Sequence, residues 1–175
     1  IKTGSLKSFS EQQLVSCSKQ NNGCNGGLMD YAFMYIADGN PLELEDSYPY
    51  TSGQGRVASC KYSKSKGVGT VSGHRDVSAG SKSQMKAALN QQPVSVAIEA
   101  DQMAFQAYTG GVISSGCGTR LDHGVLAVGY GTMNGVEYAL VKNSWGPSWG
   151  DEGYVRISMD NNSCGILNAA SYPMA

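Results

Sequence analysis

The apolar residues of this chain change their spacing at Pro93, and this change constrains the fold more than any other feature. Before Pro93 they recur every three or four residues, as in helices that bury one face. After it the chain forms short runs rich in β-branched and aromatic residues, separated by turns. These runs lie at 93–100, 123–131, 137–144 and 153–159. A helical part followed by a strand-rich part predicts an α+β fold whose second half is a sheet or a small barrel.

Three helices are expected before the strands. Ser10 followed by Gln13 is a capping-box pattern, which predicts a helix over 11–18. A second helix is expected to end at Gly39, and its apolar residues are Leu28, Met29, Ala32, Phe33 and Ile36. A third, over 83–92, is stopped by Pro93. The Ser/Gly/Lys-rich stretch 46–80 is expected to form surface loops, with a lobe boundary near His74, a residue we interpret as lying on the surface.

The chain is nearly neutral. Thirteen lysines and arginines oppose fourteen aspartates and glutamates, so the formal net charge is −1. This balance provides no basic field for nucleic acid or for an anionic membrane surface. No apolar run approaches the roughly 20 residues that a membrane-spanning helix needs. The first ten residues lack the charged-then-apolar layout of a signal peptide, and we therefore expect a mature or cut product.

The cysteines indicate the compartment. There are five, which fits an oxidising environment better than the cytosol, and none falls in a metal-type C-x-x-C pair, so no metal is expected. Because five is odd, one cysteine lacks a partner within the chain. The sequence Asn161-Asn162-Ser163 is a candidate N-glycosylation site, which fits a secretory route but also occurs by chance.

His123 is one of only two histidines and precedes an apolar run that is expected to form a strand. A histidine in this setting can be a catalytic base, although a single histidine beside a strand is more often structural. Asn143 follows a later strand and is itself followed by Trp145 and Trp149, the only two tryptophans. This arrangement suggests a polar group beneath an apolar cover. Two core tryptophans at a glycine-rich corner are the alternative.

Several long motifs narrow these choices. The strings GCNGG, LDHG and KNSWG occur in this order, at 23–27, 121–124 and 142–146. Three of seven longer segments contain them, and the seven follow one another along the whole chain: SEQQLVSC, GCNGGLMDYAF, EDSYPY, QQPVSVAIEA, CGTRLDHGVLAVGYG, VKNSWGPSWGDEGYVRI and CGILNAASYP. With these motifs in register along its length, the chain resembles the papain-like cysteine proteases, and closely their cathepsin L branch. The resemblance implies a two-lobe fold. A helical lobe would lie within 1–74, an antiparallel β-barrel lobe within 75–175, and the substrate cleft between them.

The resemblance places His123 at the family's catalytic histidine and Asn143 at the residue that orients it. The imidazole would stabilise a cysteine thiolate as an ion pair and later protonate the leaving amine. The side-chain oxygen of Asn143 would accept a hydrogen bond from the other ring N–H. Trp145 would lie over that bond and exclude water.

The nucleophile of the family stands in a C-G-[SA]-C-[WY] signature near the mature N-terminus. No such string occurs in residues 1–175, and IKTGSL at 1–6 resembles the end of the family's central helix. We therefore expect the segment that carries the nucleophile and the oxyanion-hole glutamine to precede Ile1, and we expect residues 1–175 alone to be inactive.

The same resemblance pairs Cys17 with Cys60 and Cys117 with Cys164. Cys24 is then unpaired, because its family partner lies in the preceding segment. That Cys24 is itself the nucleophile is the less favoured alternative.

The resemblance also maps the substrate-binding residues. Asn25, Gly26 and Gly27 would line the non-primed side of the cleft, where glycine lets an extended peptide approach the main chain; a plain turn before a helix is the alternative. Asp122 would modulate the charge of the site or be a solvated turn residue. The main specificity pocket would be apolar and would prefer a bulky hydrophobic residue one place before the scissile residue. Its residues are Leu28, Met29, Ala97, Leu121, Gly124 and Ala169.

The resemblance therefore implies a lysosomal or secreted cysteine endopeptidase that acts through a thioester, without metal or organic cofactor. Its expected partners are extended polypeptide substrates, the missing N-terminal segment or a pro-segment, and cystatin-like inhibitors. A catalytically inactive papain-like scaffold, acting as a binding or structural matrix protein, is the alternative. A third possibility is that residues 1–175 are one chain of a processed pair or an incomplete sequence. The residue at the nucleophile position separates them, because cysteine supports the enzyme and serine or glycine the scaffold.

Overall fold

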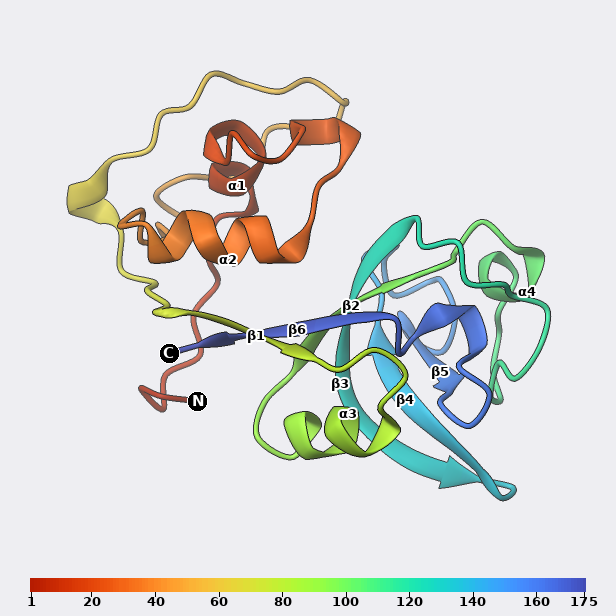
Figure 1. Ribbon diagram of the computed structural model, residues 1–175. Coiled ribbons are helices and arrows are strands. Elements are labelled where there is room, and N and C mark those ends of the chain that lie inside the picture. The colour runs from red at the N-terminus through yellow and green to blue at the C-terminus, as the bar shows by residue number, and fades with distance from the viewer. The chain divides into compact units, whose positions relative to one another are not determined.

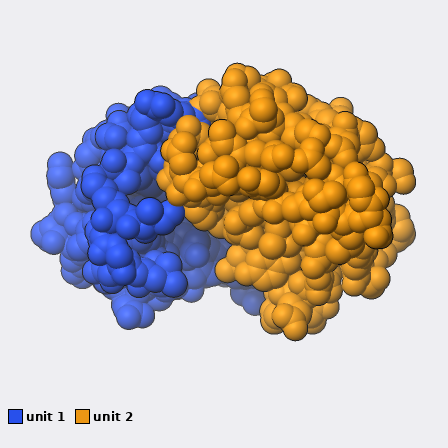
Figure 2. Space-filling model, turned by 90° about the horizontal axis from the view of Figure 1, so that it is seen from below, with its two compact units in different colours: residues 1–75, 173–175 blue, residues 76–172 orange.

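The computed structural model describes all 175 residues, which divide into two compact units. Unit 1 comprises residues 1–75 together with 173–175, and unit 2 comprises residues 76–172 (Figure 2). Helices and strands are labelled in Figure 1. None of the helices is both long enough and apolar enough to span a membrane.

Unit 1 contains the helices α1 (Glu11–Cys17) and α2 (Met29–Ala37), and the 3₁₀ turns η1 (Gly23–Asn25) and η2 (Lys64–Lys66). The side chain of Ser10 accepts a hydrogen bond from the backbone N–H of Gln13, so the predicted cap of α1 is confirmed. Gly39 follows α2 with φ +85°, a left-handed conformation that ends the helix as expected.

Polar side chains fill much of the interior of unit 1. Gln12, Gln13 and Glu43 are at most 1% exposed. The amide of Gln12 donates to Ser52, at 2.9 Å, and its oxygen accepts from the backbone of Thr51, at 2.7 Å. The oxygen of Gln13 accepts from the backbone N–H of Glu43 at 2.8 Å. These buried groups are hydrogen-bonded, which makes their burial tolerable and ties α1 to the loops that follow α2.

His74 lies at the surface as expected, but its side chain is only partly exposed. Its side chain is 22% exposed, and its Nε2 lies 3.9 Å from the carboxylate of Asp30. Its ring centre is 6.1 Å from that of Phe33 on α2. The chain returns to α2 at this point, and sequence spacing does not reveal such a return.

A six-stranded sheet dominates the second half of the chain, in the order β1-β6-β2-β3-β4-β5. The predicted strands correspond to β2 (Val94–Ile98), β3 (His123–Met133), β4 (Val136–Lys142) and β5 (Tyr154–Ser158). Two further strands, β1 (Gly73–Val77) and β6 (Ala169–Met174), were not expected, because one is largely polar and the other contains Pro173. The pairs β2/β3, β2/β6, β3/β4 and β4/β5 are antiparallel.

The sheet is open, so the expectation of a closed β-barrel is wrong. The strands β1 and β5 occupy opposite ends of the strand order, so no ladder closes the sheet on itself. Figure 1 shows β3 as a long, curved strand that runs beside β4.

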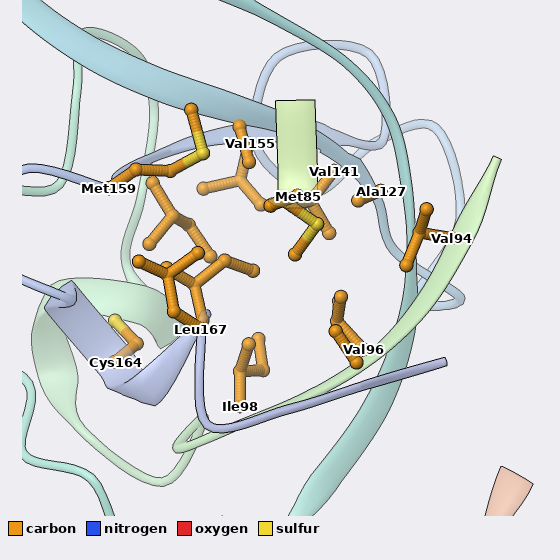
Figure 3. Packing of buried hydrophobic residues seen from close by; sticks show 14 of the residues in the cluster. Met85, Val94, Val96, Ile98, Ala127, Val141, Val155, Met159, Cys164 and Leu167 are labelled. Atoms are coloured by element: carbon orange, nitrogen blue, oxygen red, sulfur yellow. The ribbon is translucent and has the colours of Figure 1, made fainter. Parts of the chain in front are cut away.

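Two helices accompany the sheet: α3 (Lys82–Leu89), which packs on β3, and the four-residue α4 (Met103–Gln106). Ser81 caps α3 by accepting from the backbone N–H of Gln84, so this helix begins one residue earlier than predicted. The apolar core lies within unit 2, where Met85 of α3 meets Val94, Val96 and Val141 of the sheet (Figure 3).

Candidate active site

The structure brings His123 and Asn143 together. His123 begins β3 and Asn143 follows the last residue of β4, and these two strands are antiparallel neighbours. Nε2 of the imidazole lies 2.8 Å from the side-chain oxygen Oδ1 of Asn143. His123 is partly buried, and Asn143 is 7% exposed. The register of one strand pair therefore positions both side chains.

The hydrogen bonds of Asn143 define the protonation of the imidazole. Its Oδ1 also accepts from the backbone N–H of Ser144 at 2.8 Å, which fixes the orientation of the amide. Because Oδ1 only accepts, Nε2 of His123 must carry a hydrogen. In the neutral ring Nδ1 is then the unprotonated nitrogen, the form required of a general base.

An aromatic cluster surrounds the pair. The Trp145 ring lies 5.2 Å from the imidazole at a tilt of 32°. Phe105 of α4 is fully buried and presents an edge to Trp145 at 5.3 Å and to His123 at 6.3 Å. Trp149 packs on Phe105 at 4.8 Å. This cluster holds the imidazole against an apolar surface, which strengthens its hydrogen bond to Asn143.

Phe105 is the residue that sequence reasoning missed. It belongs to a helix of one turn, and a single phenylalanine outside any periodic run gives no signal of burial. The two tryptophans have different roles, one as a cover over the polar pair and the other as a core residue. Trp145 is 42% exposed and covers the pair, whereas Trp149 packs against the core and donates through Nε1 to the backbone of Gln106.

Three of the six predicted pocket residues lie on adjacent strands. Ala97 of β2 is directly opposite Gly124 of β3 on one side and Ala169 of β6 on the other. Residues opposite each other in a ladder point to the same face, and these three carry at most a methyl group. Leu121 precedes β3 and packs against Gly165: a Cβ atom on Gly165 would lie only 2.8 Å from Cδ2 of Leu121. Ala97, Gly124 and Ala169 therefore form a small apolar patch on one face of the sheet.

The remaining predicted binding residues belong to unit 1. Leu28 precedes α2 and is 55% exposed, and Met29 is the first residue of the helix. Gly26 has φ +100°, a conformation that favours glycine. The side-chain oxygen of Asn21 accepts a hydrogen bond from the backbone N–H of Leu28. A Cβ atom on Gly27 would lie 2.1 Å from this oxygen and would clash with it. Local geometry thus accounts for both glycines, and Asn25 is exposed beside them.

A family model described as "Papain family cysteine protease" matches residues 1–174. The chain belongs to the papain family. The germination-specific cysteine protease 1 of Arabidopsis thaliana is 48% identical over 180 residues, which cover 99% of this chain and 47% of that protein. The chain thus spans about half the length of the curated relatives it matches.

Solved structures of papain-family proteases confirm the fold. The proform of the ragweed pollen allergen Amb a 11 has a TM-score of 0.91 and 39% identity, covering 98% of this chain and 54% of that one. The Carica candamarcensis protease CMS1MS2, solved with E-64, has a TM-score of 0.88 and 39% identity, covering 98% and 79%. The expected papain-like α+β architecture is therefore present, with an open sheet in place of the barrel.

Asp122 anchors the start of β3. Its Oδ1 accepts from the backbone N–H of Ala100 at 2.8 Å, and its own N–H donates to the carbonyl of Ile98 at 2.9 Å. These bonds join the segment before His123 to the end of β2. The exposed carboxylate therefore orients the histidine-bearing strand of this papain-family chain, a role that sequence reasoning did not weigh.

The cysteines are paired as the papain-family resemblance implied. Disulfides join Cys17 to Cys60 and Cys117 to Cys164, and Cys24 is free and exposed. The first closes a loop within unit 1 and the second lies in unit 2. Both are consistent with an oxidising compartment.

Proposed function

We propose that this chain forms the histidine-bearing part of a cysteine endopeptidase that cleaves extended polypeptides by acyl transfer. The observation that carries the proposal is the 2.8 Å bond between His123 Nε2 and Asn143 Oδ1 beside the Trp145 ring. Such a pair leaves Nδ1 available to a thiol. Membership of the papain family gives the reaction class, and the pair supplies the group that performs its proton transfers.

In the proposed reaction His123 takes the proton of a cysteine thiol, and the thiolate attacks the scissile carbonyl carbon. The imidazolium then donates this proton to the leaving amine as the C–N bond breaks, which leaves a thioester. Water, deprotonated by the neutral imidazole, releases the acid. Asn143 holds the ring in one orientation through both half-reactions. The nucleophile signature is absent from residues 1–175, so the sulfur is supplied from outside them.

The proposed setting is the secretory pathway, ending in a lysosome-like compartment or outside the cell. Two disulfides support this setting. The apolar patch formed by Ala97, Gly124 and Ala169 supports a preference for a hydrophobic residue one place before the scissile residue. A pro-segment, cystatin-like proteins and thiol-directed epoxides are the proposed inhibitors. Among structural neighbours one is a proform and one a complex with E-64.

The test combines residues 1–175 with a separately made papain-family N-terminal segment that carries the cysteine signature. Hydrolysis of a fluorogenic peptide and labelling by a tagged epoxide are then followed. Residues 1–175 alone should give no turnover, because the loss of even one oxyanion donor typically costs ~10²–10³ in rate and here the nucleophile is absent too. The combined chains should turn over substrate, and His123→Ala should abolish this. Lys142→Ala, an exposed neighbour of Asn143, is the matched control and should retain activity.

Two results would contradict the proposal. Turnover by residues 1–175 alone that survives Cys24→Ser but not His123→Ala would reveal an unrecognised nucleophile within the chain. Combined chains that assemble but neither label nor turn over would favour the inactive scaffold.

A further inference from the structure

The sequence Asn161-Asn162-Ser163 stands directly before Cys164, one of the two cysteines of the unit 2 disulfide. Asn161 is exposed, and its Nδ2 donates to the carbonyl of Ser114 at 2.5 Å. An Asn-X-Ser sequence is an acceptor for N-linked oligosaccharide. Its use depends on whether the transferase can reach both the asparagine amide and the serine hydroxyl.

The folded chain hides the serine hydroxyl. Ser163 is only 5% exposed, and its Oγ is buried without a hydrogen-bond partner. A buried hydroxyl without a partner is destabilising and calls for an explanation outside the folded contacts. Nothing in the folded structure uses this oxygen, although the acceptor sequence requires it.

The backbone of the sequence is also locked. Asn162 has φ +53°, its Oδ1 accepts from the backbone N–H of Leu167 at 2.8 Å, and its Nδ2 donates to Asn168 at 2.7 Å. Cys164, with φ +52°, is fully buried. The segment cannot extend into a transferase site without breaking these bonds and withdrawing the residue that is joined to Cys117.

We infer that Asn161 accepts an N-linked oligosaccharide only while Cys164 is still unpaired, so that glycosylation and closure of Cys117–Cys164 compete for the same nascent segment. In the transfer Nδ2 forms a bond to C1 of a lipid-linked oligosaccharide, the lipid pyrophosphate leaves, and a transferase base takes one amide proton. Nδ2 keeps one hydrogen, which can still donate to Ser114. Because Asn161 is exposed, the attached glycan projects into solvent and the fold can then form around Ser163.

The inference rests on the secretory route proposed above, and the experiment supplies that route itself. Residues 1–175 behind a cleavable leader are translated with microsomes under reducing and oxidising conditions. The readout is the fraction of chain whose mobility changes with an endoglycosidase. Reducing conditions should raise occupancy at least twofold over oxidising conditions. Cys117→Ala, which leaves residues 161–164 intact, should raise it similarly under oxidising conditions.

Cys60→Ala is the matched control, because it breaks the other disulfide and should leave occupancy unchanged. Asn161→Gln and Ser163→Ala should both remove the glycan. Absence of glycan under reducing conditions would overturn the acceptor assignment. Equal occupancy with and without the Cys117–Cys164 bond, or an equal rise with Cys60→Ala, would overturn the competition. None of these readouts depends on peptidase activity, so failure here is distinct from failure of the proposed function.

Discussion

At the scale of single residues, the candidate site depends on a few side chains whose own partners hold them still. Asn143 is fixed by two N–H groups that share its oxygen, one from the imidazole and one from Ser144. Phe105 lies against both His123 and Trp145 without any exposed surface. Phe105 acts on the imidazole only through packing, and it is therefore a positioning residue.

Replacing Phe105 tests this packing. Phe105→Ala should destabilise unit 2 by about 3–5 kcal/mol, the usual cost of removing a buried phenylalanine. Met103→Ala, on the same helix but 75% exposed, should change the unfolding free energy by no more than about 0.5 kcal/mol. Urea unfolding followed by tryptophan fluorescence measures both. Equal effects from the two variants would mean that the burial of Phe105 does not stabilise unit 2.

Ala169 provides a test of specificity that rests on the proposed function. It lies opposite Ala97 on the apolar patch, and no carboxylate stands there to bind a basic side chain. In the combined enzyme, Ala169→Glu should raise the cleavage of peptides with Arg, relative to those with Leu, one place before the scissile residue by about tenfold, equivalent to about 1.4 kcal/mol. Ala169→Gln is the neutral control of the same shape. A peptide library varied at that position gives the ratios, and an unmodified enzyme that already prefers Arg would refute the assignment.

At the scale of elements, a charged cluster ties α3 to the sheet. Lys82 contacts both Glu137 of β4 and Asp160, which follows β5, and Lys86 lies 2.5 Å from Glu137. Lys86 also lies over the Tyr130 ring of β3, and Asp160 accepts from the backbone N–H of Glu137. Hydrogen bonds from Lys82 and then Lys86 lower the pKa of Glu137, and Lys82 lowers the pKa of Asp160.

These lowered pKa values predict an acid-dependent loss of stability. A carboxyl group whose pKa is lower in the folded state stabilises the protein above its unfolded pKa, roughly 4 for these groups, and this contribution disappears as the pH falls through the folded value. Glu137→Gln should therefore flatten the dependence of the unfolding free energy on pH below about 4.5. Glu152→Gln, exposed in unit 2 outside this cluster, should retain the wild-type slope. Denaturant titrations across this pH range measure the free energy of unfolding. If its dependence on pH is unchanged in Glu137→Gln, the charged cluster is not the cause of the acid-dependent loss of stability.

At the scale of the whole molecule, the two units are stabilised differently. The large cluster of buried apolar residues lies between Val77 and Ala170, within unit 2. In unit 1 the buried apolar residues are Cys17, Ile36 and Tyr48, beside the hydrogen-bonded Gln12, Gln13 and Glu43. Unit 1 should therefore depend more strongly on its disulfide.

Removing the disulfide of unit 1 should destabilise that unit selectively. Cys17 and Cys60 are 43 residues apart, a loop for which the chain-entropy model gives about 4 kcal/mol. In Cys17→Ser/Cys60→Ser, amide hydrogen exchange should accelerate in α1 and α2 while β2 to β5 stay protected. Cys117→Ser/Cys164→Ser should instead accelerate exchange in unit 2. Uniform acceleration across both units in the first variant would show that they unfold as one.

Local patterns in the sequence determined the features that depend on neighbouring residues. They include the Ser10 cap, the end of α2 at Gly39 and the four strands β2 to β5, since caps and periodicity involve residues only a few positions apart. The motif series correctly indicated the papain family and the two disulfides. The placement of His123 beside Asn143 also followed from that series.

The tertiary structure alone decided what depends on distant segments. Whether a sheet closes depends on which strands occupy its edges, and β1 and β6 join this sheet by pairing with each other although they lie far apart in the sequence. Phe105 and Ser163 are buried because remote segments cover them, and Asp122 is anchored by the end of β2. Long-range pairing and burial are properties of the assembled core, and no local spacing of residues encodes them.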